Sequence, residues 1–196
     1  MLSRSGPLPS GQTWRFELKW DGFRAIVSTE DGLRVRSRRG WDMTHAVPEL
    51  AELPSGLILD GELVAWSEGE PWFPDVCHRV LNRDLTIPLT LVVFDVLWVN
   101  GEDMTSAPFS ERRATLERLE LNGPDWATSD VFEDGDALFT AVCQHGLEGV
   151  VAKRLDSRYG PNRRGWIKTK NPNYWRRDSE REAMQRSRER RARTHV

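Results

Sequence analysis

Lysine is scarce in this 196-residue chain, although basic residues are not. Of the 28 basic residues, four are lysines (Lys19, Lys153, Lys168 and Lys170) and the others are arginines. Arginine does not lose its proton in a protein, whereas lysine can, and its neutral amine is a nucleophile. The pattern predicts that at least one lysine does amine chemistry. The alternative is a base-composition bias that left four lysines by accident.

The lysines occur at spacings that matter on an extended strand. Lys19 and Asp21 are two residues apart, as are Lys168 and Lys170, so each pair is predicted to face one side of its strand. Two ammonium groups on one face repel each other unless an anion lies between them, and a phosphate fits that place. The alternative is a solvated, positively charged strand face.

Two acids lie within or beside apolar strand-like segments. Glu62 follows Asp60-Gly61, and Glu148 precedes Gly149. Such acids can bind ribose hydroxyls, hold Mg²⁺ through water, or only form ion pairs. The chain has no glycine-rich phosphate loop, so a nucleotide would be held by side chains. The four histidines are scattered and indicate neither a triad nor a metal cluster: His45, His78, His145 and His195.

The elements that must position these residues are mainly strands. Apolar and β-branched runs predict strands at 16–19, 24–28, 33–37, 57–66, 89–99, 126–132, 149–153 and 166–170. Helices are predicted at 48–53, at 74–83, from a capping Ser110 onward, and at 134–146. Asp21-Gly22 and Asp31-Gly32 are predicted to be hairpin turns. The fold class is therefore α+β, with antiparallel β-sheets and flanking helices.

Composition favours one domain in the cytoplasm. The chain is 38% hydrophobic and 30% charged with a net charge of −2, which does not mark a nucleic-acid binder but leaves room for local basic patches. Cys77 and Cys143 are expected to be reduced, and no apolar run predicts a membrane span. We expect a flexible leader at 1–13, a folded domain at 14–170 and a charged tail at 171–196 with no core to join.

Six segments, in this order, resemble the motif series of the covalent nucleotidyltransferases. They are most similar to the adenylation domain of bacterial ATP-dependent DNA ligases, including those of non-homologous end joining, and the resemblance covers about residues 14–170. It implies an ATP-grasp-like nucleotidyltransferase fold. The segments are Lys19-Trp20-Asp21-Gly22, Ser37-Arg38-Arg39-Gly40, Asp60-Gly61-Glu62, Phe94-Asp95-Val96-Leu97, Glu148-Gly149-Val150-Val151-Ala152-Lys153 and Trp166-Ile167-Lys168-Thr169-Lys170.

The resemblance implies roles for individual residues. Lys19 would attack the α-phosphate of ATP, release pyrophosphate and carry AMP as a phosphoramidate. Lys168 and Lys170 would hold the α-phosphate and stabilise its developing charge. Lys153 is part of a motif but receives no step. The remaining implied contacts are Glu62 and Arg24 with the ribose, Arg24 also with phosphate, Phe94 and Val151 with the two faces of adenine, Glu17 with its amino group, Glu148 with Mg²⁺ or Mn²⁺, and Arg38 with AMP or a 5′-phosphate.

The resemblance implies that AMP passes to the 5′-phosphate of nicked or broken double-stranded DNA, in a monomer that does not contact membranes. In that family an OB-fold domain follows the last lysine motif, whereas only 171–196 follow it here. We therefore expect an adenylation domain standing alone, with a separate OB-fold or end-joining protein as a potential partner. The arginines of the tail either attract phosphates in a salt-dependent way or keep the protein soluble. Two alternatives remain: an RNA ligase or GTP-using capping-type enzyme, and a non-catalytic module that binds DNA ends or nicks.

Overall fold

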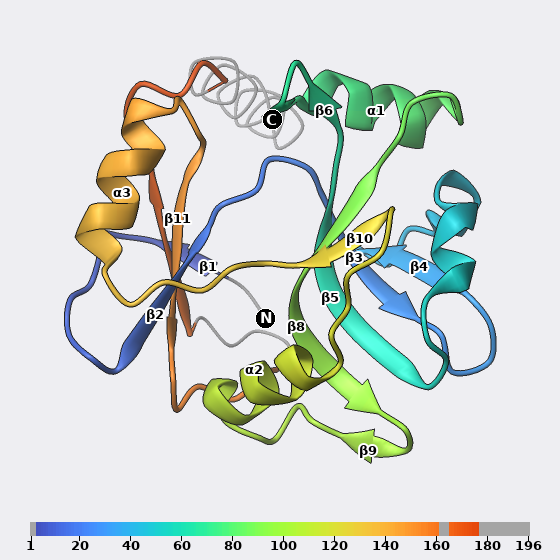
Figure 1. Cartoon of the computed structure of the whole chain (residues 1–196), viewed down its shortest axis with the longest axis horizontal. Coiled ribbons are helices and arrows are strands. Elements are labelled where there is room, and N and C mark those ends of the chain that lie inside the picture. Colours follow the sequence, from blue (N-terminus) through green and yellow to red (C-terminus); the bar gives the residue numbers. More distant parts are fainter. Residues whose placement is uncertain (1–2, 161–164, 177–196) are drawn as a thin grey trace, which may run out of the picture.

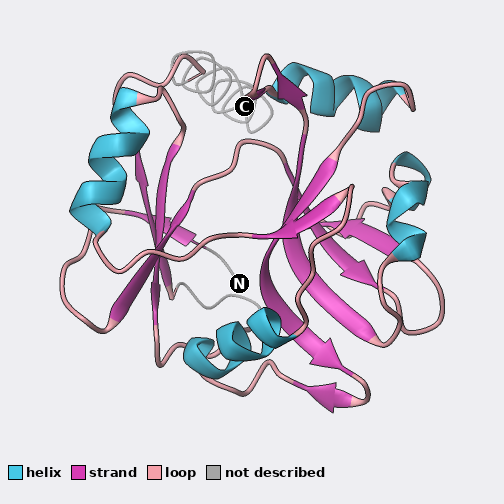
Figure 2. Ribbon diagram, viewed as in Figure 1, coloured by secondary structure: helices cyan, strands magenta, loops and turns pink. Residues whose placement is uncertain are grey.

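The computed structural model describes residues 3–160 and 165–176 and contains two main β-sheets that lie side by side (Figures 1 and 2). The smaller sheet has the order β1 (Ser3–Ser5), β12 (Trp166–Lys170), β11 (Gly149–Arg154), β2 (Trp14–Leu18). The larger has the order β10 (Trp126–Thr128), β8 (Thr90–Val99), β5 (Leu57–Val64), β3 (Phe23–Ser28), β4 (Arg34–Ser37), with β9 (Glu102–Asp103) also paired to β8. A short hairpin joins β6 (Trp66–Ser67) and β7 (Glu70–Pro71).

In the described part of the chain, three α-helices pack against these sheets. They are α1 (Phe73–Asn82) near β5, α2 (Phe109–Arg118) on β8 and α3 (Gly135–Gln144) on β11 and β2. Two 3₁₀ helices, Thr44–Ala46 and Pro48–Glu52, follow β4. Most strand pairs are antiparallel, and the parallel pairs are β1–β12 and β8–β10. The predicted α+β class with antiparallel sheets and flanking helices is confirmed. No helix in the described ranges is long and apolar enough to cross a membrane.

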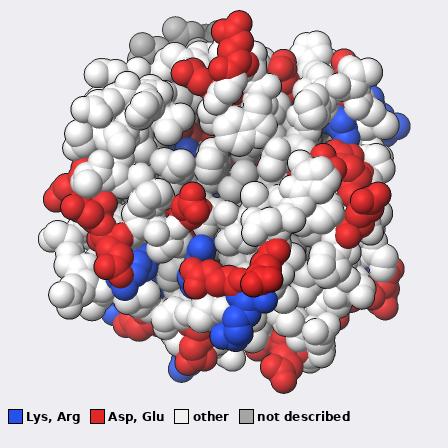
Figure 3. Space-filling model, viewed as in Figure 1, with Lys and Arg blue, Asp and Glu red and all other residues white. Residues whose placement is uncertain are grey.

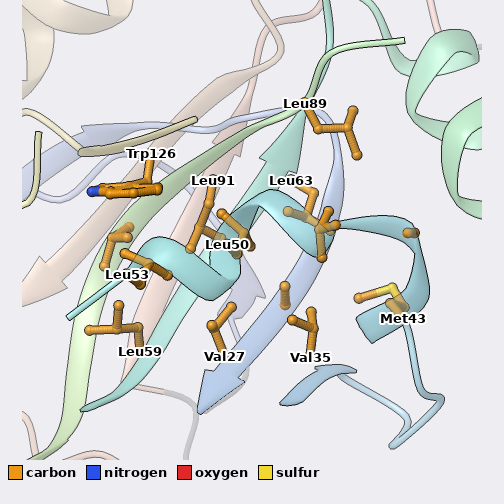
Figure 4. Packing of buried hydrophobic residues seen from close by; sticks show 14 of the residues in the cluster. Val27, Val35, Met43, Leu50, Leu53, Leu59, Leu63, Leu89, Leu91 and Trp126 are labelled. Carbon is orange, nitrogen blue, oxygen red and sulfur yellow. The ribbon is translucent and has the colours of Figure 1, made fainter. Parts of the chain in front are cut away.

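Each sheet has its own hydrophobic core. The larger core lies between β3, β5 and β8 and the 3₁₀ segment that follows β4, and Figure 4 shows Val27, Leu59 and Leu91 turned toward Leu50 and Leu53. The smaller core packs β2, β11 and β12 against α3, and its buried residues are Phe16, Leu138, Val142, Val150, Ala152 and Ile167. Burying these side chains stabilises the fold by roughly 1.5 to 3 kcal/mol for each large residue.

The two cores explain why one predicted turn is wrong. Asp31-Gly32 does connect the antiparallel pair β3–β4, but Asp21-Gly22 does not form a hairpin. β2 pairs with β11, and its apolar face packs in the smaller core. β3 pairs with β4 and β5, and its apolar face packs in the larger core. The Lys19–Gly22 segment therefore crosses between sheets. Since β2 ends at Leu18, the prediction that Lys19 and Asp21 share a strand face is also wrong.

Three further expectations need correction. Ser110 does not cap α2, because the helix begins at Phe109 and its N-cap residue is Pro108. Phe109 is fully buried, which ties the start of the helix to the core. The predicted leader includes β1, which pairs with β12, and Leu8 packs on the smaller core. The predicted tail begins with residues that do join the fold, since Tyr174 is buried. The rest of that tail, 177–196, lies outside the described residues.

Candidate active site

A cavity of about 510 Å³ is lined by residues of both sheets and contains most of the predicted site. Chain segments far apart in sequence meet here because β11 pairs with both β2 and β12. This pairing sets Val151 opposite Glu17 on one side and opposite Lys168 on the other. Eight of the ten predicted site residues line the cavity: Glu17, Lys19, Arg24, Arg38, Glu62, Phe94, Val151 and Lys168.

The other two predicted residues, Glu148 and Lys170, lie beside Lys19. The Lys19 Nζ donates to Glu148 Oε2 at 2.6 Å, and the Lys170 Nζ lies 2.9 Å from Glu148 Oε1. The Glu148 side chain is only 3% exposed, against 20% for Lys19 and 29% for Lys170. One buried carboxylate thus balances two ammonium groups. The structure places Lys168, but not Lys170, among the residues that line the cavity.

The segment that carries Lys19 is anchored at every residue. The Lys19 amide donates to Gly149 O at 2.9 Å, and the Trp20 indole donates to Ser129 Oγ at 3.3 Å. At Gly22, an added Cβ would lie 2.0 Å from Leu63 O, so only glycine allows this approach to β5. The backbone that presents Lys19 to the cavity is therefore preorganised.

Arg24 is held by Asp60, a buried acid that lies in one of the motif segments but to which the resemblance assigned no role. Its Nε and Nη2 donate to the two oxygens of Asp60 at 2.9 and 2.6 Å. The Tyr159 hydroxyl donates to Asp60 Oδ2 at 2.7 Å, and the guanidinium lies 5.7 Å from the Phe94 ring and 5.3 Å from the Trp166 ring. Burial acts to lower the pKa of Arg24, but Asp60 outweighs burial and raises it. Arg24 therefore stays charged at the cavity wall.

Lys153, to which the motif resemblance assigned no step, pairs with Glu17 in the cavity wall. Both side chains are almost fully buried, and Lys153 Nζ lies 2.8 Å from Glu17 Oε1. Lys153 also donates to Phe94 O at 2.8 Å and lies within 5 Å of the Phe94, Phe109 and Trp166 ring centres. Burial raises the pKa of Glu17, and the charge of Lys153 opposes this. Glu17 Oε1 thus has the Lys153 ammonium as its ion-pair partner, although this contact falls outside ideal hydrogen-bond geometry.

Glu62 faces the same cavity from β5, opposite Arg24 on β3. Burial raises its pKa from 4.5 to about 8, with Lys19 and Arg24 opposing the rise and Glu148 and Asp60 adding to it. At neutral pH, the Glu62 carboxyl group is therefore protonated in most of the folded molecules. A protonated carboxyl can both donate and accept a hydrogen bond, which suits a hydroxyl partner.

Sequence reasoning gave no site role to three residues that shape this cavity. Trp166 is 4% exposed and lines it, Trp41 is 45% exposed at the same wall, and Tyr159 holds Asp60 from behind. Trp166 and Asp60 lie in quoted motifs, so their positions carried a signal. Trp41 and Tyr159 lie outside the motifs, and only the tertiary structure brings them to the site.

The chain matches the family model described as "ATP dependent DNA ligase domain" over residues 8–170. It is 36% identical over 181 residues to the multifunctional non-homologous end joining protein LigD of Mycolicibacterium smegmatis, covering 87% of this chain and 23% of that protein. It is 35% identical to the SPbeta prophage-derived DNA ligase-like protein LigB of Bacillus subtilis, covering 81% of this chain and 61% of that protein.

Solved structures of related proteins have the same fold. The ligase domain of Mycobacterium tuberculosis LigD superposes with a TM-score of 0.75 at 34% identity, covering 86% of this chain and 58% of that one. A mycobacterial DNA ligase D complexed with ATP and MES gives the same TM-score at 33% identity and the same coverages. The chain thus spans less than a quarter of the LigD relative quoted above and 58% of these ligase-domain chains. It belongs to the family of ATP-dependent DNA ligase domains and corresponds to their adenylation domain.

Proposed function

We propose that Lys19 is adenylated by ATP and that the domain passes AMP to the 5′-phosphate of a broken DNA strand. The observation that carries this proposal is the position of the Lys19 Nζ, at the wall of a cavity of about 510 Å³ and 2.6 Å from a buried carboxylate. A non-catalytic module has no need of an amine there, where an arginine could pair with Glu148 as well. The family match favours a DNA ligase over an RNA ligase or a capping enzyme.

The cavity wall provides groups suited to each part of a nucleotide. Phe94 and Val151 supply apolar surface for the two faces of adenine, and the Glu17 carboxyl group, which lines the cavity, can accept from the adenine amino group. Glu62 is the group suited to a ribose hydroxyl, and Arg24 can reach ribose or phosphate from the same wall. The lining of the cavity therefore supports the nucleotide roles that the family resemblance implies.

Lys19 then acts as the nucleophile. Its Nζ forms a bond to the α-phosphorus as the bond to the bridging oxygen breaks, and pyrophosphate leaves with that electron pair. From its ammonium form Nζ loses two protons in all, one before the attack and one as the phosphoramidate forms. Glu148, the acceptor at 2.6 Å, can take the first, and the second can pass to the departing pyrophosphate or to solvent. Lys168 and Lys170 stabilise the charge on the phosphate, and loss of one such group would raise the barrier by about 3 kcal/mol, or about a hundredfold in rate.

Magnesium fits this site only as an ion shared with the nucleotide. Within the described ranges no three His, Cys, Asp or Glu side chains gather to hold a metal. Mg²⁺ in nucleotide sites needs only one or two carboxylates plus phosphate oxygens and water, and Glu148 is the carboxylate that meets this need. When bound, the ion, or Mn²⁺ in its place, would neutralise charge on the phosphates.

The rim of the cavity offers a contact for the 5′-phosphate of the acceptor. Arg38 is exposed and lines the cavity, so it can meet a 5′-phosphate. On the face shown in Figure 3, basic and acidic side chains form small alternating groups and not one continuous basic area. We propose that this domain works in the cytoplasm as a monomer and that tight DNA binding needs further contacts, from an OB-fold or end-joining protein.

The test is incubation with α-labelled ATP and Mg²⁺, followed by denaturing electrophoresis. We expect label that survives denaturation in the wild type and is absent in Lys19→Ala and in Lys19→Arg. Lys19→Arg is the matched control, because it keeps the positive charge beside Glu148 but offers no nucleophilic amine. Intact mass before incubation reveals protein that already carries AMP, and GTP in place of ATP should give no label. If AMP-free wild-type protein stays unlabelled, the proposal is wrong.

A further inference from the structure

The residues that follow β12 fold back onto the segment that carries Lys19. Asn171 is 1% exposed; its amide donates to Glu148 O at 2.9 Å and its side chain donates to Leu147 O at 3.0 Å. The Asn173 amide in turn donates to the Asn171 side chain at 2.9 Å. The backbone beyond the last motif is thus fastened to the start of β11, immediately beside the carboxylate that holds Lys19.

Two residues near the end of this segment, Tyr174 and Arg176, bond to the Asp21 carboxylate. The Tyr174 hydroxyl donates to Asp21 Oδ2 at 2.5 Å, and the Arg176 guanidinium pairs with Asp21 Oδ1. Trp175, between them, stacks on Trp72 with ring centres 5.0 Å apart. Burial, together with the hydrogen bond to Asp21, raises the pKa of Tyr174, so its hydroxyl remains a donor throughout the working pH range.

Asp21 is the residue of the Lys19–Gly22 segment that bonds to side chains beyond the last motif, those of Tyr174 and Arg176. Lys19 is anchored on β11, Trp20 on Ser129 and Gly22 on β5. Asp21 does not line the large cavity. It lines a separate cavity of about 110 Å³ whose wall also includes Glu148, and Lys19 lines both cavities. A change at Asp21 therefore reaches the nucleotide site through the backbone of Lys19.

We propose that Tyr174 is a positioning residue for Lys19, acting through its hydrogen bond to Asp21. This inference rests on the proposed function of Lys19 as the adenylated nucleophile. A nucleophile must be held close to its attack geometry, and small displacements cost much rate. Losing the Tyr174 hydroxyl would loosen the segment without removing any group of the nucleotide cavity. The rate of adenylation should then fall while the affinity for ATP is kept.

The chain offers a matched pair for the test, because it has two tyrosines and each donates to a buried aspartate. Tyr159 holds Asp60, the partner of Arg24, whereas Tyr174 holds Asp21. For Tyr174→Phe we expect adenylation at saturating ATP to be about tenfold slower, which corresponds to about 1.4 kcal/mol, with KM unchanged. For Tyr159→Phe we expect KM for ATP to rise about threefold, with a smaller effect on the maximal rate.

Single-turnover labelling over a range of ATP concentrations measures both constants, and thermal melting shows whether each variant is folded at the assay temperature. Asp21→Ala, which removes the partner of both Tyr174 and Arg176, should slow adenylation at least as much as Tyr174→Phe. Adding Tyr174→Phe to it should slow adenylation little further, since the acceptor of the Tyr174 hydroxyl is already gone. If wild type is labelled but Tyr174→Phe matches it in rate, the inference is wrong while the proposed function stands. A Tyr174→Phe defect that appears in KM and not in rate also contradicts it. Wild type that is never labelled refutes the proposed function itself.

Discussion

The charge of Glu62 should make folding stability depend on pH in a way that one substitution removes. Burial raises the pKa of Glu62 from 4.5 to about 8. Between these two pH values the folded protein keeps a proton that the unfolded chain has released. Because the folded state binds this proton more tightly, the proton adds to the free energy of unfolding. This contribution is complete below about pH 4.5 and is lost as pH rises toward about 8. Glu62→Gln keeps the shape of the side chain but cannot titrate.

The size of the effect follows from that pKa. Each whole step in pKa is worth about 1.36 kcal/mol, so a rise from 4.5 to about 8 corresponds to at most about 5 kcal/mol. Glu62 keeps part of its surface exposed to water, which screens its charge. We therefore expect wild type to lose about 2 kcal/mol more than Glu62→Gln on going from about pH 5 to about pH 9.

Urea denaturation of both proteins across this pH range measures the difference. Other groups that titrate, Glu17 included, are common to the two proteins and cancel in the comparison. A gap between the two free energies of unfolding that opens as pH rises supports the reasoning. Parallel curves, or a gap that opens as pH falls, would show that the Glu62 carboxyl is not held protonated by burial in the folded state.

Three further predictions concern other parts of the molecule. Arg112→Ala should lower the free energy of unfolding by about 3 to 5 kcal/mol in urea denaturation, because it leaves the Asp95 carboxylate, which has 0% side-chain exposure, without its ion-pair partner. Gly22→Ala should cost about 3 kcal/mol or more and abolish labelling by ATP, since its Cβ would lie 2.0 Å from Leu63 O; stability close to wild type would contradict this. Arg38→Ala should keep labelling by ATP but slow AMP transfer to nicked DNA about tenfold in a gel assay of adenylated DNA, because Arg38 lies on the exposed rim of the cavity.

Much of the candidate site could be predicted because its residues lie at fixed positions in strand motifs. Val151 and Lys168 lie in two of the quoted motif segments and Glu17 lies two residues before the first, and the family resemblance assigned all three to one nucleotide. Their actual contact comes from pairing between β2, β11 and β12. A strand pattern shows which residues alternate in exposure, but it does not select a partner strand more than a hundred residues away.

The wrong predictions share this cause. Asp21-Gly22 is a strong local turn signal, yet the flanking strands bury their apolar faces in different cores, so the turn became a crossover. The leader and the start of the tail looked too polar and too short to fold alone. They are ordered because β12 gives β1 an edge to pair with and Asp21 gives Tyr174 a buried acceptor. Local composition cannot reveal a partner supplied by the rest of the fold.

Two physical reasons account for lysine, and not arginine, at two of the four lysine positions in this chain. In the function that we propose, Lys19 is the nucleophile, a role that an amine can fill and a guanidinium cannot. Lys153 meets a different need, because its ammonium fits among three aromatic rings, a carbonyl and Glu17 with 1% of its side chain exposed. A planar guanidinium is larger and presents five donors, which this enclosure could not satisfy. Arginine is used instead where a two-oxygen partner lies opposite, as Asp60 does for Arg24 and Asp95 for Arg112. The choice between the two basic residues therefore follows the geometry of each acceptor as well as the chemistry of the nucleophile.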